Sequence, residues 1–394
     1  MLTDADKKEI TNILTLRYSP VPLSNDAKTW QDFIPKNNVT IDGASRTVHE
    51  MLSGSFAGMN KLGLTVSGGI DSSVLLHSAS KSVENLVTFS VLVDGKKDPM
   101  LERMIANYET DHHDIVLDRI FKEMPRHIWL VQKPMWNMWS YYLLKYASKY
   151  CDILCTGDGG DELFGGYTFR YQQFLNGNLA SPIDRVKSYL DGHGRDWVPD
   201  QKDLFGKSIN FDWDSVYSLL VPYFDNPLEP LDQVFLADFN GKLLHDWHPM
   251  FQRWADAFNL KLFRPFLSKE MISFALRIPV SLKYDRNSSK GKLILRHLLA
   301  SYGLQELSAQ GKQGFAFDTI KLWQKEGKEI FENIMDQSEV VEAGLISMEW
   351  IDRTLGSQER QASHRYVNKL LGILALEVWH RIFITKSMSL NQTL

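Results

Sequence analysis

A short apolar run, a loop rich in serine and glycine, and a second apolar run follow one another between residues 62 and 76. Residues 62–66 have the length and composition of a buried strand, and residues 74–76 open a helical pattern. Between these runs lie Ser67, Gly68, Gly69, Ile70, Asp71, Ser72 and Ser73. A strand, a tight loop and a helix N-terminus in this order form an anion cradle suited to phosphate groups.

The loop differs from the P-loop of many nucleotide-binding proteins. That pattern needs a glycine five residues before Gly206-Lys207-Ser208, where this chain has Gln201. Asp71 would repel a bound phosphate unless a cation lies between them, so the sequence predicts Mg²⁺ at this loop. The alternative is a plain glycine–serine turn in which Asp71 caps the helix.

Strand and helix patterns alternate over about 100 residues in the first half of the chain. Further strands are predicted at 86–93, 114–117 and 152–155, with a helix at 138–150. This alternation indicates an α/β fold with a doubly wound parallel sheet. From residue 231 onward helical patterns dominate, and residues 168–230 are predicted as helices with long loops. We predict a lead-in segment over 1–45, an α/β core over 46–168 and a mostly helical region over 169–394 packed on that core.

A second glycine-rich loop follows the strand at 152–155. Five glycines and three acids lie among Thr156, Gly157, Asp158, Gly159, Gly160, Asp161, Glu162, Leu163, Phe164, Gly165, Gly166 and Tyr167. Because parallel strands end at one edge of a sheet, the two loops should meet there. So many glycines cost stability, which favours a backbone shaped around a ligand. A calcium loop or a plain turn is the alternative, although the spacing does not fit an EF-hand.

Composition excludes several classes of protein. The formal net charge is −4 and 44% of residues are hydrophobic, which argues against a broadly basic nucleic-acid-binding surface and against wholesale disorder. The two cysteines, Cys151 and Cys155, supply neither a disulfide framework nor a four-ligand zinc site. The N-terminus lacks the apolar segment of a signal peptide, and no stretch is long enough to span a bilayer. We expect a cytoplasmic protein without membrane or nucleic-acid partners.

Taken together, the two loops resemble the synthetase domain of the asparagine synthetase family, whose first loop is that of the N-type ATP pyrophosphatases. Other segments are similar in the same order along the chain. They are Phe89-Ser90-Val91 at the adenine-binding strand, residues 291–296 at Gly-Lys-x-x-Leu-Arg, 312–315 at Lys-x-Gly-Phe and 376–381 at Leu-Glu-x-Trp-x-Arg. The resemblance covers about residues 45–385 and is weakest over 170–250.

The resemblance implies adenylation of a carboxylate by ATP, followed by attack of a nitrogen nucleophile and release of AMP and pyrophosphate. It implies that Asp71 and Asp161 ligate Mg²⁺, and that Lys292 stabilises developing negative charge in both half-reactions. As an alternative, Lys292 is a solvated helix residue. Asp158 is the candidate general base, at a position where asparagine synthetases carry Glu and β-lactam synthetases Tyr. The implied ATP- and pyrophosphate-binding residues are Val66, Ser67, Gly68, Gly69, Asp71, Ser72, Ser73, Val91, Thr156 and Gly157.

The chain departs from the family pattern in two places. Glutamine-dependent members carry a nucleophilic Cys directly after the initiator Met, where this chain has Leu2. We therefore expect nitrogen from free ammonia, a separate glutaminase subunit or an amine on a larger substrate. In the acceptor segment Lys261, Phe263 and Ser268 replace the family's Glu, Arg and Asp, with Arg264 beside them.

Asparagine formation from aspartate and ammonia is the leading hypothesis. An amide ligase or cyclase acting on a different carboxylate is the alternative. A thiolating or tRNA-modifying pyrophosphatase would need a reactive cysteine and a basic surface, and the overall charge does not support it. A catalytically silent partner subunit is disfavoured because Asp71, Asp161 and Lys292 are all present.

Overall fold

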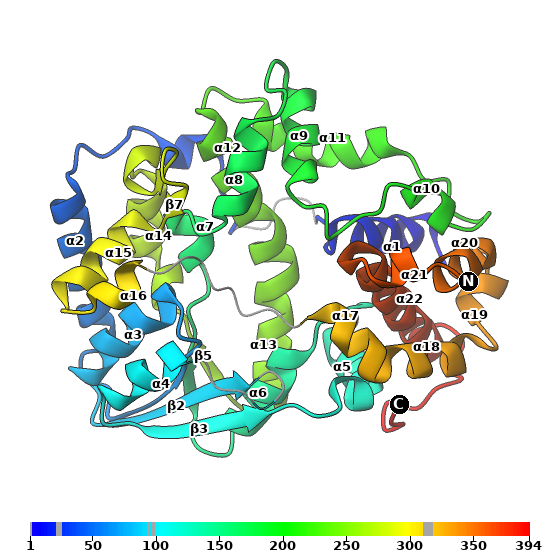
Figure 1. The fold of residues 1–394 in the computed structure, drawn as a ribbon, viewed down its shortest axis with the longest axis horizontal. Helices are drawn as coiled ribbons and strands as arrows, with labels where there is room; N and C mark the ends of the chain where they lie inside the picture. The colour runs from blue at the N-terminus through cyan, green and yellow to red at the C-terminus, as the bar shows by residue number, and fades with distance from the viewer. Residues whose placement is uncertain (1, 21–25, 93–94, 96–98, 310–317) are drawn as a thin grey trace.

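The structure is a computed structural model that describes residues 2–20, 26–92, 95, 99–309 and 318–394. The segment 312–315, which is similar to the family's Lys-x-Gly-Phe, lies outside the described residues. Figure 1 shows a sheet with its helices at one end of the molecule and a cluster of C-terminal helices at the other.

Among the described residues, five parallel strands form one sheet in the order β3-β2-β1-β4-β5. They are β1 (Lys61–Thr65), β2 (Asn85–Leu92), β3 (Asp111–Val116), β4 (Ile153–Cys155) and β5 (Lys261–Phe263). The order confirms the predicted doubly wound α/β class. Because β2 and β4 lie on opposite sides of β1, the winding reverses there, and the loops after β1 and β4 border the position where such sheets bind ligands.

Helices cover this sheet, and its central strands are buried along nearly their whole length, as expected for parallel strands covered on both faces. Helices α2 (Ile41–Phe56), α3 (Ile70–Ser80) and α15 (Leu293–Ser301) pack against one another, on the left in Figure 1. Helix α6 (Trp139–Ala147) packs against β2 and against α13 (His248–Ala257), which leads into β5.

Helices make up most of the rest of the chain, as predicted. They include α7 (Gly160–Phe164), α8 (Thr168–Leu175), α9 (Pro182–Asp191), α11 (Trp213–Phe224), α12 (Pro230–Asp238), α14 (Lys269–Leu276), α18 (Lys328–Met335), α19 (Glu339–Glu342), α20 (Met348–Leu355) and α22 (His364–Phe383). The helical pattern over residues 231–254 contains an irregularity that its periodicity does not reveal. A π-helical segment, η3 (Phe239–Trp247), joins α12 to α13.

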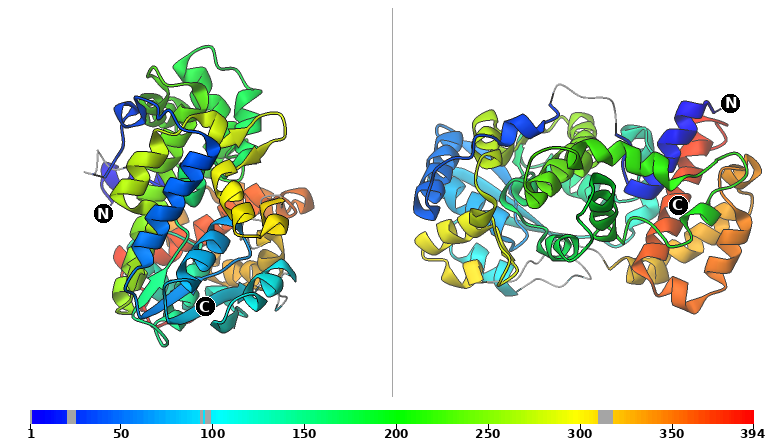
Figure 2. Two further views of the ribbon diagram at one scale, coloured as in Figure 1. Left: turned by 90° about the vertical axis from the view of Figure 1, so that its left-hand side faces the viewer. Right: turned by 90° about the horizontal axis from the view of Figure 1, so that it is seen from above.

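The segment predicted as a lead-in contains a well-capped helix, α1 (Asp4–Leu16). Thr3 and Asp6 form a reciprocal capping box, with Thr3 Oγ accepting from Asp6 N at 3.2 Å and Asp6 accepting from Thr3 N at 2.8 Å. The helix packs against α22, where Lys369 Nζ donates to the carbonyl of Leu14. In Figures 1 and 2 it lies beside the C-terminal helices rather than beside the sheet. The division into three parts stays a prediction.

None of the helices in the described part of the chain combines the length and the apolar character needed to cross a membrane.

Candidate active site

The first loop lies between β1 and α3, and its backbone is anchored to β2. Val66 N donates to the Phe89 carbonyl at 2.8 Å, and Ser90 Oγ donates to the Val66 carbonyl at 2.8 Å. Ser67 is exposed, and Gly69 at the N-cap supplies no side-chain hydrogen bond to the first turn of α3. The N-terminus of α3 therefore keeps donor groups and a positive dipole end available to an anion.

Two serines at the start of α3 are buried and bond within the loop. Ser72 Oγ donates to the Gly69 carbonyl at 3.1 Å, and Ser73 Oγ donates to the same carbonyl at 2.7 Å. Ser73 also lies 2.9 Å from the sulfur of Met104. Both side chains thus shape the loop, and their contact with pyrophosphate stays a prediction.

The second loop packs so closely against Asp71 of the first loop and against its own Asp161 that two of its positions have room only for glycine. A Cβ atom at Gly160 would lie 2.6 Å from Asp71 Cγ, and one at Gly166 would lie 1.7 Å from Asp161 Oδ1. Real Cβ atoms do not approach other atoms so closely. The glycine-rich loop is therefore built around the two aspartates.

Lys292 reaches this cluster from the start of α15. Its own backbone is left-handed, with φ 55° and ψ 36°, and its N–H donates to the Phe164 carbonyl at 3.0 Å. Its Nζ contacts Asp71 Oδ2 and lies 2.6 Å from Asp161 Oδ1. The structure thus brings together three predicted site residues that are far apart in the sequence.

The side chain of Lys292 is only 9% exposed, while those of Asp71 and Asp161 are 19% and 25% exposed. Burial alone would lower the pKa of Lys292, but the carboxylates of Asp161 and Asp71 outweigh burial and raise it. The lysine is therefore a charged ammonium, and the alternative of a solvated helix residue is wrong. A buried cation between two acids is well suited to stabilise a developing negative charge.

The acids of this cluster are compatible with Mg²⁺. Two carboxylates meet the ammonium of Lys292 here, and the negative charge of Asp71 also acts on Arg296. The described residues contain no group of three or more His, Cys, Asp or Glu side chains that could hold a metal. Mg²⁺ is commonly held by one or two carboxylates together with substrate phosphates and water, so Asp71 and Asp161 fit as its protein ligands.

Asp158 lies on the same loop but has different partners. Its Oδ2 accepts from Thr156 Oγ at 2.8 Å and from Arg264 Nε at 3.2 Å. Arg264 directly follows β5, a three-residue strand that the sequence analysis did not predict. The pairing of Arg264 with Asp158 was likewise not predicted. The one sequence feature that could have indicated this contact is the charge of Arg264, which directly follows Phe263 in the segment that departs from the family pattern.

The other predicted nucleotide contacts lie where neighbouring strands end. Val66 follows β1, Val91 is near the end of β2, and Thr156 follows β4, where its N–H donates to the Phe263 carbonyl at 3.0 Å. Gly157 packs against Asp71, because a Cβ there would lie 3.3 Å from Asp71 Cβ. Their contacts with the nucleotide stay predictions.

Glu162 is a buried neighbour of the cluster. Its Oε1 accepts from the hydroxyl of Tyr167 at 2.7 Å, and the guanidinium of Arg170 stacks over the Tyr167 ring at 4.1 Å. Burial, with a smaller effect from the charge of Asp161, raises the pKa of Glu162 to about 7. Together with Arg170, this pair links the glycine-rich loop to α8, a role of Tyr167 that no local sequence pattern predicts.

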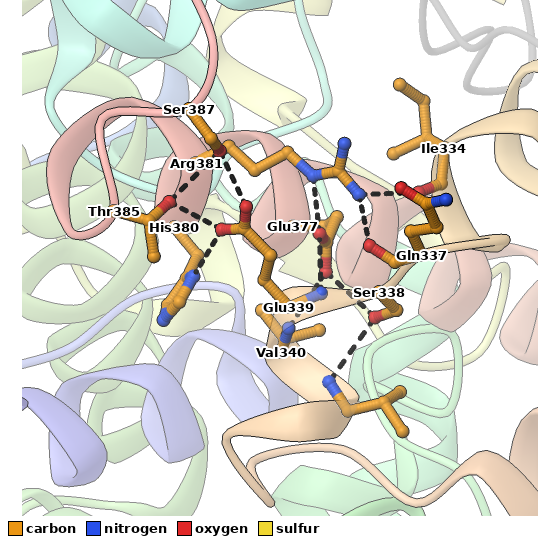
Figure 3. A network of polar contacts seen from close by, with 11 residues as sticks. Ile334, Gln337, Ser338, Glu339, Val340, Glu377, His380, Arg381, Thr385 and Ser387 are labelled. Carbon is orange, nitrogen blue, oxygen red and sulfur yellow. Dashed lines mark hydrogen bonds and ion pairs between the residues drawn. The ribbon is translucent and has the colours of Figure 1, made fainter.

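The C-terminal motif at residues 376–381 has a structural role. Glu377 is fully buried on α22 and accepts hydrogen bonds from Ser338 Oγ at 2.9 Å and from the N–H groups of Glu339 and Val340 at 3.0 Å each. Arg381 Nε donates to it at 2.6 Å. Figure 3 shows these contacts gathered at the N-terminus of α19. The motif therefore joins α22 to α19, and it does not reach the Lys292 cluster.

The chain is similar to known proteins along most of its length. Residues 54–381 match the family model described as asparagine synthase. Glutamine-hydrolyzing asparagine synthetase 1 of Bacillus subtilis is 25% identical over 376 residues, which is 82% of this chain and 56% of the relative.

Two further relatives are named as putative glutamine-hydrolyzing asparagine synthetases. The one from Mycobacterium tuberculosis is 22% identical over 418 residues, or 96% of this chain and 62% of its own length. The one from Methanocaldococcus jannaschii is 30% identical over 154 residues, or 37% of this chain and 29% of its own length. The chain thus spans less than two thirds of the length of these relatives. Because the family model covers most of the chain, from the start of the sheet to α22, this chain belongs to the asparagine synthase family.

Proposed function

We propose that the chain is an ATP-dependent amide ligase that forms AMP and pyrophosphate, and that it makes asparagine from aspartate and ammonia. The observation that carries the proposal is the convergence of Asp71, Asp161 and Lys292 beside the loops after β1 and β4. Membership of the asparagine synthase family supports both ATP as a substrate and amide formation as the reaction class.

The first half-reaction joins the substrate carboxylate to the α-phosphate of ATP and releases pyrophosphate. We assign the pyrophosphate to the N-terminus of α3 and the exposed hydroxyl of Ser67. Asp71 and Asp161 would hold Mg²⁺, which when bound neutralises charge on the phosphate oxygens. Lys292 has a buried positive charge close to both acids, and it stabilises the negative charge that develops during transfer.

In the second half-reaction, nitrogen attacks the acyl-adenylate. The cysteines of this chain are poor candidates for releasing that nitrogen from glutamine. Cys151 and Cys155 are both buried, and burial raises the pKa of Cys151 to about 11. Burial also raises the pKa of Cys155. We therefore assign the nitrogen to free ammonia or to a separate glutaminase subunit.

The test follows AMP, pyrophosphate and asparagine after mixing purified protein with MgATP, L-aspartate and ammonium. We expect all three products from the wild-type protein and none from Asp71→Ala. Release of AMP without asparagine would move the assignment to another carboxylate. Failure to bind MgATP would overturn the proposal.

One observation favours a second candidate, an amide ligase for a different carboxylate. Ser268, which stands where the family has Asp, caps α14 by accepting from Met271 N at 3.3 Å. Ser268 therefore acts as a helix cap, and it offers no acidic side chain at a position where the family pattern has one. A panel of mono- and dicarboxylic amino acids, assayed for carboxylate-dependent AMP release, separates the two candidates by which member gives the highest kcat/KM.

A further inference from the structure

The contact between Arg264 and Asp158 lies at the same sheet edge as the Lys292 cluster but does not belong to that cluster. Strands β4 and β5 are parallel neighbours, with Cys155 opposite Phe263, so the residues that follow them leave the sheet side by side. Asp158 comes three residues after β4, and Arg264 comes directly after β5. The contact therefore joins two adjacent loops across 106 residues of sequence.

The loop that carries Asp158 also contacts Asp71, through glycines that lie before and after Asp158 in the sequence. A Cβ at Gly157 would lie 3.3 Å from Asp71 Cβ, and one at Gly160 would lie 2.6 Å from Asp71 Cγ. Asp158 is therefore fixed beside the proposed phosphate site by its own backbone. Its position relative to the acids is set by the loop, and the direction of its carboxylate is set by its two hydrogen-bond donors.

Those two donors bind the same oxygen of Asp158. Thr156 Oγ and Arg264 Nε both donate to Oδ2, and among the described residues Oδ1 has no hydrogen-bond donor. The side chain of Arg264 is 9% exposed, whereas that of Asp158 is 24% exposed. The Arg264 side chain is thus largely buried, and the carboxylate of Asp158 is the more solvent-accessible of the two groups.

We propose that Arg264 is a positioning residue for the amide-forming step, which it serves by holding Asp158 Oδ2 so that Oδ1 faces the nitrogen nucleophile. The inference rests on the proposed function. As the nitrogen attacks the acyl carbon, a C–N bond forms and the C–O bond to AMP breaks. The electron pair of that bond leaves with AMP, and one nitrogen-bound proton passes to Asp158 Oδ1.

A carboxylate is a weak base, and a weak base is sufficient here. The nitrogen becomes positively charged as it bonds to the acyl carbon, so its proton becomes more acidic during the step. Burial lowers the pKa of the neighbouring His248, and Arg264 lowers it further. This imidazole is therefore neutral near pH 7 and adds no second cation beside the carboxylate.

The test separates the two half-reactions in Arg264→Gln and Arg264→Lys. Carboxylate-dependent exchange of labelled pyrophosphate into ATP reports adenylation, and amide formation at saturating ammonium reports the second step. In Arg264→Gln we expect exchange within about threefold of wild type and a fall of about 10²-fold in the kcat of amide formation. Arg264→Lys should recover part of that loss because it restores a charged donor. Arg253→Gln, which changes an exposed arginine on α13, should match wild type in both assays.

A second nucleophile distinguishes positioning from general damage to the fold. Hydroxylamine needs less help from a base than ammonia does, so replacing ammonium with hydroxylamine should reduce the defect of Arg264→Gln. Equal loss of exchange and amide formation, or equal loss with both nucleophiles, would overturn the inference. So would wild-type amide formation by Arg264→Gln. Absence of pyrophosphate exchange in the wild-type protein would instead count against the proposed function itself.

Discussion

The chain holds carboxylates in two contrasting ways. On α22, Glu377 accepts from four donors, two of them backbone N–H groups, and Arg381 balances its charge (Figure 3). At the sheet edge, Asp71 and Asp161, which are 19% and 25% exposed, both contact the ammonium of Lys292. A carboxylate whose lone pairs are all bound to the fold stabilises structure. A pair of acids that water still reaches can instead bind a cation and a substrate.

The first prediction tests the structural side of this comparison. In Glu377→Ala, Arg381 loses its carboxylate and two buried N–H groups lose their acceptor, so the free energy of unfolding should fall by about 3 to 5 kcal/mol. Amide formation per folded molecule should be unchanged at low temperature. Urea denaturation measures the first quantity, and Glu342→Ala on the exposed face of α19 is the control. A large loss of kcat without a loss of stability would show that Glu377 has a functional role rather than a structural one.

The second prediction tests the functional side. Lys292→Met should lower kcat/KM about 10²- to 10³-fold, because it removes a buried donor from the developing charge. Its effect on stability should be smaller than that of Glu377→Ala, since water reaches Asp71 and Asp161, which are 19% and 25% exposed. Steady-state kinetics and thermal melting check the two statements, with the exposed Lys290→Met as the control. Near-normal activity would remove Lys292 from the mechanism.

The third prediction extends the comparison to a carboxylate without donors. Asp246 in η3 is 2% exposed, and neither of its oxygens accepts a hydrogen bond from the described residues. Burial raises its pKa from 3.8 to about 6, although Arg17 and Lys242 oppose the shift. Between these values the folded state keeps a proton that the unfolded state has lost, so stability falls as the pH rises through this window.

Asp246→Asn should therefore equal wild type in stability near pH 4 and exceed it by about 2 kcal/mol at pH 8. Denaturation curves at several pH values give this difference directly. Asp214→Asn, at an exposed aspartate on α11, should show no such trend. A difference that stays constant with pH would mean that Asp246 is not the group that titrates.

The smallest expected effect separates two serine caps. Ser338 Oγ accepts from Val341 N at 3.3 Å and donates to Glu377, whereas Ser347 Oγ only accepts from Trp350 N at 3.3 Å. Ser338→Ala should cost about 1 kcal/mol more than Ser347→Ala, because it also removes a hydrogen bond from a buried charge. Parallel denaturation of the two variants checks this. Equal losses would show that Ser338 acts as a cap alone.

The parts of the site that the sequence predicts well are local. An apolar strand followed by a glycine-rich loop is visible within residues 62–76, and parallel strands then bring the second loop to the same edge. Lys292 was predicted through its resemblance to a family motif, but its left-handed backbone was not. The domain boundaries and the individual ligand contacts stay predictions.

The parts that it predicts poorly depend on distant contacts. Strand β5 has only three residues, which are too few to form a recognisable strand pattern in the sequence. It is defined by its pairing with β4, a contact that the local sequence does not reveal. The contact between Arg264 and Asp158 depends on that strand. The π-helical segment η3 keeps a helical pattern of apolar residues, which periodicity cannot distinguish from a regular helix.

The packing of α1 against α22 has a consequence for how the protein is made. The carbonyl of Leu14 receives hydrogen bonds from Gln201 Nε2 at 3.1 Å and from Lys369 Nζ, and Lys369 is 355 residues later in the chain. At translation rates of roughly 5 to 20 residues per second, α1 leaves the ribosome roughly 20 to 70 seconds before that partner exists. During this interval the face of α1 that packs against α22 in the folded protein has not yet made that contact. Chaperones should therefore be able to bind α1 in newly made chains, and the packing of α1 against α22 should be among the last steps of folding.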